Sequence, residues 1–136
     1  MATVTTLYSG SLRTEATHEQ SGTVIITDAP LDNHGRGEAF SPTDLLAASL
    51  GSCMITLIGI SAKNHGFNID GTKVSITKFM AANPRRVSAI EVILDFPQVI
   101  YEAKIKNIIE KAALTCPVAV SLHPDIEQRV IFNFFK

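Results

Sequence analysis

Two cysteines are the residues whose chemistry and placement most restrict the function of this chain. Cys53 lies within an uncharged stretch, LLAASLGSCMITLIGISA, and Cys116 directly precedes Pro117. Two cysteines are too few for a disulfide-framework miniprotein. In a reducing compartment, such a pair is more often redox-active, catalytic or metal-binding than a permanent cross-link. The two cysteines are far apart in the sequence, so any partnership between them must be made by the fold.

The two positions predict different thiol chemistry. Cys116 lies at the start of a predicted helix, where the positive end of the helix dipole can lower the pKa of a thiol. Cys53 lies within a predicted buried helix, where desolvation disfavours a thiolate unless a cation is near. Candidate cations are Arg13, Arg36, Lys63, Arg85 and Arg86. Either cysteine can alternatively be an unreactive core residue, because free cysteines are often buried and only fill space in the core.

Length, composition and charge restrict the class of protein. The chain has 136 residues, of which 46% are hydrophobic and 18% charged, and its formal net charge is -1. These values predict a single domain over residues 1–136 and exclude a disordered chain. The charge balance argues against a nucleic-acid binder that relies on net positive charge. The first residues, MATVTTLYSG, lack the pattern of a secretory signal, so we expect a cytoplasmic protein.

The uncharged stretch over residues 45–62 reaches the length of a membrane-spanning helix. Hydroxyl residues and glycines dilute its hydrophobicity, and no second such stretch exists. We therefore predict a buried central helix of a soluble protein and no membrane partner. Its small residues, among them Gly51 and Gly59, are expected to let another helix approach closely.

Start signals place this helix at residues 42–64. Ser41 is a favoured N-cap residue and Pro42 suits the first helical turn. Asp44 completes a capping-box-like pattern, with its carboxylate near the positive end of the helix dipole. Gly66 is the expected stop signal.

The remaining segments predict an α+β fold. Alternating and β-branched residues indicate strands at 3–8, 11–17 and 23–27, and a hairpin made by 72–81 and 87–96. Apolar residues at helical spacing indicate a helix at 99–114, followed by a short helical turn at 117–122. A final strand is expected at 129–135.

Two sequence segments carry a resemblance to a known family. GEAFSPTDLLAASLGSCM, followed much later by TCPVAVSL, resembles the OsmC/Ohr family of thiol peroxidases, and most closely its OsmC-like branch. The resemblance extends over nearly the whole chain. It implies a long buried central helix wrapped by antiparallel sheets, in an intertwined homodimer whose sites lie near the dimer interface.

The resemblance also implies an activity. Cys53 matches the cysteine that attacks the O–O bond of an organic hydroperoxide and becomes a sulfenic acid. Cys116 matches the cysteine that condenses with it to a disulfide, which a dithiol reductant then reduces. This cycle follows general cysteine chemistry and requires neither a metal nor an organic cofactor.

An arginine beside the reactive thiolate belongs to the same pattern. Arg13 matches it by position and would supply the cation that Cys53 needs. In the peroxidase branch a glutamate near the helix start orients this arginine, but Thr43 occupies that position here. Asp44 and Glu38 are the candidate replacements for this acid. Phe40 and Met54 are candidate walls of the substrate site.

Two other functions compete with the peroxidase prediction. One is an OsmC-like dimer that binds a small apolar molecule and whose cysteines only pack, which Thr43 in place of the orienting acid favours. The other is a metal site built from Cys53, Cys116 and a histidine. Metal ligands usually occur at close sequence spacing, which these residues lack, so the metal site is the weaker alternative.

Overall fold

The N-terminal part of the chain forms a small antiparallel sheet, as predicted. The computed structural model describes residues 1–136 and divides them into two units, Met1–Leu46 and Ala47–Lys136. In the first unit the strands are β1 (Val4–Gly10), β2 (Arg13–His18) and β3 (Val24–Asp28), arranged in the order β1-β2-β3. A short 3-10 helix, η1 (Leu31–Asn33), follows β3.

Apolar side chains of this first sheet remain exposed to an unusual degree. Strand pairing places successive side chains on opposite faces of the sheet. Large apolar residues are exposed on both faces; they are Val4, Leu7, Tyr8, Val24, Ile25 and Ile26. An isolated small sheet is more stable in water when its apolar face packs against another element.

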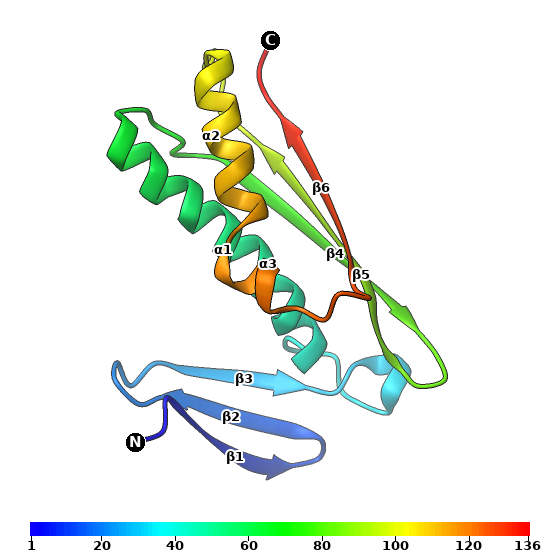
Figure 1. The fold of residues 1–136 in the computed structure, drawn as a ribbon. Coiled ribbons are helices and arrows are strands. Elements are labelled where there is room, and N and C mark those ends of the chain that lie inside the picture. The colour runs from blue at the N-terminus through cyan, green and yellow to red at the C-terminus, as the bar shows by residue number, and fades with distance from the viewer. The chain divides into compact units, whose positions relative to one another are not determined.

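The second unit combines a sheet with helices. The long helix α1 (Pro42–His65) begins in the first unit and continues into the second. The other elements are β4 (Lys73–Ala81), β5 (Arg86–Asp95), α2 (Ala103–Leu114), α3 (Pro117–Ser121) and β6 (Glu127–Asn133). The predicted α+β class is confirmed, and Figure 1 shows the elements in order.

One expectation about the sheets is wrong. β4 and β5 form the predicted antiparallel hairpin, but β6 pairs with β5 in parallel, with Ala89 opposite Glu127 and Asp95 opposite Asn133. The second sheet, in the order β4-β5-β6, is therefore mixed rather than antiparallel. The reason is that α2 and α3 connect β5 to β6, and a crossover of this length is what a parallel pair requires.

The start of α1 has the predicted capping box. The backbone N–H of Ser41 donates to Asp44 Oδ2 at 2.9 Å, and the backbone N–H of Asp44 donates to Ser41 Oγ at 3.0 Å. Ser41 is buried, so this reciprocal pair satisfies donors that water does not reach. The helix ends at His65, and Gly66 follows with φ of +73°, as expected for a C-terminal stop.

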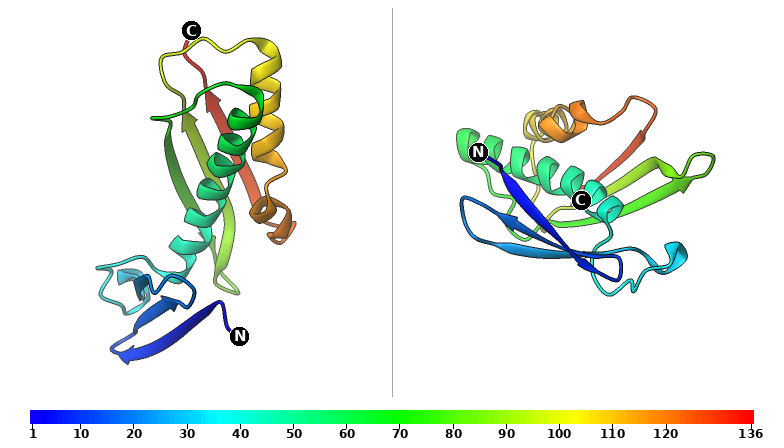
Figure 2. Two further views of the ribbon diagram at one scale, coloured as in Figure 1. Left: turned by 90° about the vertical axis from the view of Figure 1, so that its left-hand side faces the viewer. Right: turned by 90° about the horizontal axis from the view of Figure 1, so that it is seen from below.

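The core of the second unit lies between α1, α2 and one face of the sheet. Figure 2 shows both helices on the same face of β4, β5 and β6. The buried residues of α1 recur at helical spacing; they are Ala47, Leu50, Gly51, Met54, Ile58 and Ala62. They meet inward-facing residues of β5 such as Ile90, Val92 and Leu94, which are fully buried. This contact fixes α1 and therefore the position of Cys53 along it.

α1 is also the one helix of the structure that is long and apolar enough to cross a membrane by length and composition. Its most apolar window has a mean hydropathy of 1.9, and 33% of that window is buried. The buried part belongs to the core of the second unit. The outer side of the helix is less covered than predicted, since Leu46 and Ile60 remain exposed.

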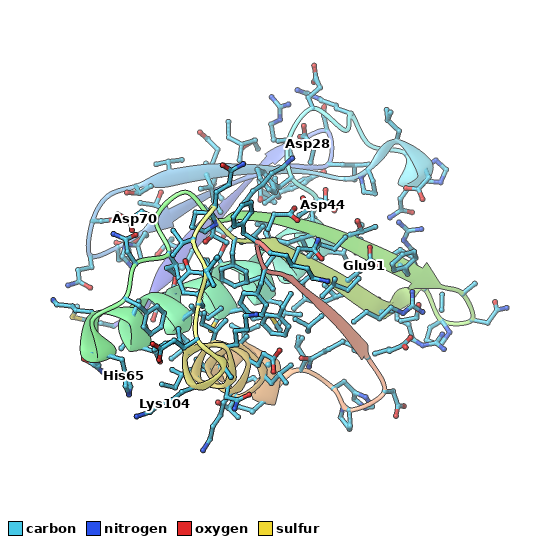
Figure 3. The ribbon with its side chains drawn as sticks, turned by 90° about the horizontal axis from the view of Figure 1, so that it is seen from above. Asp28, Asp44, His65, Asp70, Glu91 and Lys104 are labelled. Carbon is cyan, nitrogen blue, oxygen red and sulfur yellow. The ribbon has the colours of Figure 1, made fainter.

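The second helix begins later than the sequence indicates. We predicted a helix from residue 99, but Glu102 is the extended N-cap residue and α2 starts at Ala103. The preceding segment is held by Tyr101, which is buried and donates its hydroxyl to the carbonyl of Asn68 at 2.6 Å. Lys104 lies on the side of α2 away from the sheet, as Figure 3 shows.

Gly51 permits the close packing of α1 on β4. A Cβ at this position would lie 2.6 Å from Cγ1 of Ile76 and 3.3 Å from Cγ1 of Val74. Its neighbour is thus a strand, not the helix that the sequence suggested. At Gly59 a Cβ would meet only Cδ1 of Ile69, at 4.0 Å. The two glycines of one helix therefore differ in the space that surrounds them.

We predict opposite effects for alanine at these two glycines. Gly51→Ala should lower the free energy of unfolding by about 1 kcal/mol, because overpacking costs about 1–3 kcal/mol and exceeds the gain in helix propensity. Gly59→Ala should raise it by about 0.5–1 kcal/mol, since only the propensity gain applies. Urea denaturation measures both values. Equal changes of the same sign would contradict the packing role of Gly51.

Candidate functional site

The fold brings the two cysteines together. Cys53 is on α1, is half-buried, and packs against the core. Cys116 is fully buried and lies at the N-cap of α3. The two side chains lie close enough for Cys53 to raise the pKa of Cys116. Residues that are distant in sequence therefore meet at one site of the second unit.

Local structure between α2 and α3 positions Cys116. The backbone is extended at Cys116, with φ of -65° and ψ of 151°, so it separates the two helices. Pro117 occupies the first turn of α3, where its missing N–H is not needed. The backbone N–H of Ala119 donates to the sulfur of Cys116 at 3.4 Å, so the thiol caps this short helix.

The pKa of Cys116 is raised, which corrects the expectation of a depressed value at a helix start. Burial is the main cause, and the contact with Cys53 adds to it. The hydrogen bond from Ala119 acts in the opposite direction but is outweighed by burial. α3 has only 5 residues, so its dipole is small. Cys116 is consequently a thiol, not a thiolate, at neutral pH.

The two sulfurs differ in their exposure to reagents in solvent. Cys53 is partly reachable from solvent, whereas Cys116 has no exposed surface. A reagent from solvent therefore meets Cys53 first. Because Cys116 already contacts Cys53, it can attack an oxidised Cys53 and close a disulfide, provided that the pair adopts disulfide geometry.

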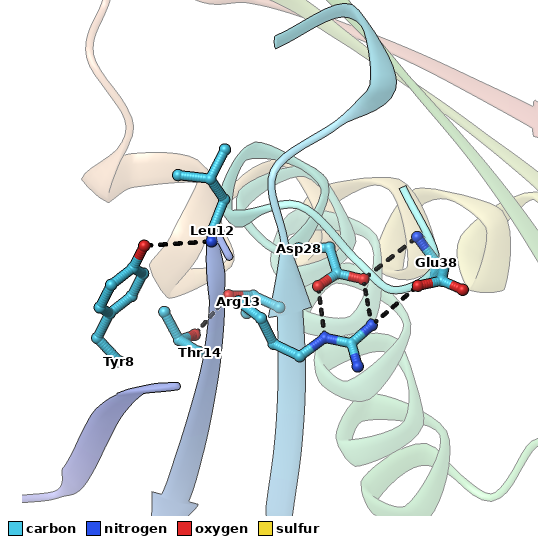
Figure 4. Close-up of polar contacts among 7 residues, drawn as sticks. Tyr8, Leu12, Arg13, Thr14, Asp28 and Glu38 are labelled. Carbon is cyan, nitrogen blue, oxygen red and sulfur yellow. Dashed lines mark hydrogen bonds and ion pairs between the residues drawn. The ribbon is translucent and has the colours of Figure 1, made fainter. Parts of the chain in front are cut away.

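Arg13 is held by carboxylates of the first unit. Its Nε donates to Asp28 Oδ1 at 2.7 Å, and its Nη2 donates to Asp28 Oδ2 at 2.9 Å. Nη2 also donates to Glu38 Oε1 at 3.3 Å. Figure 4 shows the fork between Arg13 and Asp28 with Glu38 beside it. These contacts raise the pKa of Arg13, with the hydrogen bond to Asp28 as the first cause, and keep the guanidinium charged.

Sequence reasoning missed Asp28. Of the two acids it proposed for Arg13, Glu38 makes one contact, whereas Asp44 accepts the backbone N–H of Ser41 in the capping box. The signal that could have identified Asp28 is strand register, since Arg13 and Asp28 are directly opposite each other on β2 and β3. Residues opposite each other in an antiparallel pair share one face of the sheet.

The carboxyl of Asp28 is ionised. It is fully buried, and its hydrogen bonds with Arg13 lower its pKa below the ordinary value, against the effect of desolvation. A further bond from the backbone N–H of Glu38, at 3.2 Å, acts in the same direction. The pair is thus a buried carboxylate with a partly exposed guanidinium.

The two predicted wall residues lie in contrasting surroundings. Phe40 is exposed, and its carbonyl accepts the backbone N–H of Asp28 at 3.0 Å. Met54 is fully buried within the core of the second unit. Met54 lies on the face of α1 that packs on the sheet.

The cysteines do not form part of a cluster of metal-ligating side chains. No group of three or more histidine, cysteine, aspartate or glutamate residues in the structure could hold a metal ion. His123, the histidine nearest to Cys116 in the sequence, accepts the backbone N–H of Asp125 at 3.0 Å and closes a turn. The geometry gives the metal-site alternative no support.

The unequal access predicts selective alkylation of the reduced protein. Iodoacetamide at neutral pH should modify Cys53 and leave Cys116 intact, because Cys116 is buried and its raised pKa keeps it protonated. Iodoacetamide should alkylate Cys116 only at a pH well above the range in which an ordinary thiol reacts. Mass spectrometry of tryptic peptides measures both sites. Equal modification at neutral pH would contradict the assignment.

Solved structures share this fold. A protein from Psychrobacter arcticus 273-4, whose name proposes an osmotic stress induced and detoxification response role, is 55% identical, with a TM-score of 0.93 over 97% of this chain and 96% of that chain. An OsmC-like protein from Mycoplasma pneumoniae is 18% identical, with a TM-score of 0.81 over 98% and 96%. An organic hydroperoxide resistance protein, OsmC, from Legionella pneumophila is 14% identical, with a TM-score of 0.77 over 98% of each chain.

A family model gives the assignment at the level of sequence. The model described as "OsmC-like protein" matches residues 35–130, which include both cysteines but not Arg13 or Asp28. No curated protein sequence matches the chain. The match covers well over half of the chain, and the fold and the cysteine motif agree with it. This chain belongs to the OsmC-like protein family.

Proposed function

We propose that this protein is a cysteine-dependent peroxidase that reduces organic hydroperoxides. The observation that carries the proposal is the contact between a half-buried Cys53 and a fully buried, protonated Cys116. A single accessible thiol backed by a second thiol is the arrangement that a two-cysteine peroxide reduction needs. Relatives of the same fold that are named organic hydroperoxide resistance proteins agree with this substrate class.

The first step oxidises Cys53. Its thiolate attacks the terminal oxygen of R–O–OH, the O–O bond breaks, and the departing RO⁻ takes a proton to leave as an alcohol. Cys53 becomes a sulfenic acid, which carries the transferred oxygen. The peroxide has gained two electrons from the sulfur, so the step balances without a metal.

The second step uses Cys116. Its sulfur attacks the sulfenic sulfur of Cys53, the S–O bond breaks, and hydroxide leaves with the proton of Cys116 as water. A disulfide between the two cysteines results. A dithiol reductant then exchanges with this disulfide, becomes a disulfide itself, and returns both cysteines to thiols. This cycle requires a reducing compartment such as the cytoplasm.

Arg13 is the proposed cation for the thiolate. A thiolate in an apolar recess needs a fixed positive charge, because desolvation disfavours the charged form. Arginine suits this role, since it stays charged and can face a carboxylate on one side and a second group on the other. Its contacts with Asp28 keep it protonated at every physiological pH.

The main rival function is binding of a small apolar molecule without peroxidase activity. It rested on the loss of the orienting acid, since Thr43 stands where the peroxidase branch has glutamate. Arg13 nonetheless has two carboxylate partners, Asp28 and Glu38. These two carboxylates support the peroxidase proposal over the rival function.

A homodimer is part of the proposal. The first sheet exposes apolar side chains on both faces, and Ile60 of α1 is 52% exposed. Apolar surface of this extent usually marks a protein interface. A second copy of the chain would cover it, as the family resemblance implies.

The peroxidase proposal predicts how many thiols per chain a hydroperoxide consumes. Reduced protein mixed with excess cumene hydroperoxide should lose two titratable thiols per chain and gain one intramolecular disulfide. Cys53→Ser should lose all measurable turnover. Cys116→Ser should still react once but then accumulate sulfinic acid, because no resolving thiol remains. Thiol titration and mass spectrometry follow these species.

Unreactive thiols would contradict the proposal. If wild-type protein keeps both thiols after excess peroxide while its fold is intact, the peroxidase proposal fails. Binding of an apolar fluorophore by the same sample would then favour the rival function.

The dimer predicts a mass twice the 14.7 kDa of one chain in light scattering after size-exclusion chromatography. Ile60→Glu places a charge on the exposed apolar side of α1 and should shift the population toward monomer by at least tenfold in dissociation constant. Asn107→Glu, on the exposed side of α2, serves as the matched control and should remain dimeric. A wild-type monomer at micromolar concentration would overturn the dimer proposal.

A further inference from the structure

Gln128 is a polar residue at an apolar position of β6. Side chains alternate between the two faces of a strand, so Gln128 shares its face with Val130 and Phe132. Both of these apolar residues pack against the core. Gln128 is also paired in register with Ile90 of β5, which is fully buried. An apolar side chain would suit the core at this position, so the amide calls for a separate reason.

The amide of Gln128 binds α3. Its Nε2 donates to the carbonyl oxygen of Ala119 at 2.9 Å. Ala119 lies in the second half of a helix of 5 residues, where backbone carbonyls lack partners within the helix. In Figure 1 the loop that follows α3 leads into β6. The side-chain hydrogen bond therefore ties the short helix back onto the strand that comes next in the chain.

Ala119 connects this hydrogen bond to the second sulfur. Its backbone N–H donates to Sγ of Cys116 at 3.4 Å, and both residues are buried. Ala119 is the buried residue within α3, whereas Val120 beside it is 71% exposed. A segment with so little buried surface has little packing to fix its orientation. The bond from Gln128 thus helps to hold the N–H of Ala119 on the sulfur.

The second step of the proposed cycle places charge on Cys116. Its sulfur gives up a proton as it bonds to the sulfur of Cys53, and burial disfavours the anionic character that develops there. The N–H of Ala119 acts in the opposite direction, since it favours the charged form of the thiol. A donor that is already in place stabilises such charge without a cost of reorganisation. A group that fixes Ala119 therefore favours disulfide formation.

We propose that Gln128 is a positioning residue for the second step: it holds Ala119 so that the N–H of this residue stays on Sγ of Cys116 while the disulfide forms. The inference rests on the proposed function, because it assigns Cys116 to the attack on oxidised Cys53. All four residues belong to the Ala47–Lys136 unit. Gln128 acts through Ala119, so it affects the second step and not the first attack by Cys53.

The test measures how oxidised Cys53 divides between two products. Cys116 converts the sulfenic acid to a disulfide, whereas a second hydroperoxide converts it to a sulfinic acid. Mass spectrometry gives the cumene hydroperoxide concentration at which the two products are equal. Gln128→Met should lower this concentration about fivefold, which is the effect of one lost hydrogen bond on a rate. The rate of the first oxidation of Cys53 should stay at the wild-type value.

A double mutant separates positioning from a merely structural role. In a Cys116→Ser background, Gln128→Met should leave the rate of sulfinic acid formation unchanged, because the effect runs through Cys116. A faster formation of sulfinic acid in this background would overturn the inference. So would a folded Gln128→Met protein, checked by circular dichroism, whose products divide as in the wild type.

The matched control is a second polar side chain of β6. Asn133 Nδ2 donates to Asp95 Oδ1 at 2.8 Å, in a side-chain hydrogen bond at the far end of the same strand. Asn133→Leu removes this bond and should give the wild-type division of products. An equal shift in Asn133→Leu and Gln128→Met would show a general effect on the sheet and overturn the role of Gln128.

Gln128→Asn covers the case in which Gln128→Met does not fold. It keeps the amide but shortens the side chain by one methylene, so the donor no longer reaches Ala119 at the same distance. The products should shift toward sulfinic acid by about twofold or more, in line with a weakened hydrogen bond. An unchanged division of products in the folded variant would contradict the inference.

Diamide distinguishes failure of this inference from failure of the proposed function. The thiolate of Cys53 adds to its N=N bond, and Cys116 then displaces the hydrazine, which leaves with two electrons and two protons as the disulfide forms. If the wild type consumes no hydroperoxide, the proposed function fails, and slower disulfide formation with diamide in Gln128→Met still supports the positioning role. If wild-type turnover is normal and Gln128→Met matches the wild type with both oxidants, only the positioning role fails.

Discussion

The contact between two thiols is the constraint on which the arrangement of the second unit depends. Cys53 lies on α1, which packs closely against β4 where Gly51 leaves room for Ile76 and Val74. Cys116 reaches this contact because α2 ends at Leu114 and Pro117 starts a new helix after one extended residue. Cys116 is also a buried core residue, so redox chemistry and packing share the same atoms. A chemical change at either thiol therefore alters the packing of the core.

Local signals predicted most of the elements. The Ser41–Asp44 capping box and the periodicity of residues 42–64 gave α1 almost to the residue, since caps and apolar spacing act over a few positions. The late start of α2 was missed because Ile100 fits the helical spacing although it is exposed in the structure. The parallel pairing of β5 and β6 joins distant segments, and no local pattern encodes it.

In the candidate site, too, short sequence motifs were predictive and contacts made by tertiary packing were not. The family resemblance drew attention to both cysteines and to Arg13, but not to the acid that holds the arginine. Asp28 lies one residue beyond the strand predicted at 23–27, and only the β2–β3 register reveals its partner. The direction of the pKa shift of Cys116 was also mispredicted, because burial depends on tertiary packing and outweighs the dipole of so short a helix.

The placement of the Arg13–Asp28 pair has a consequence for the exchange of segments between related chains. Arg13, Asp28 and Glu38 all lie in the N-terminal unit, whereas both sulfurs belong to the C-terminal one. The segment matched by the family model begins at residue 35 and leaves Arg13 and Asp28 outside it. Exchanging residues 1–46 for those of a homologue would therefore change the arginine–carboxylate pair and leave both sulfurs in the chain.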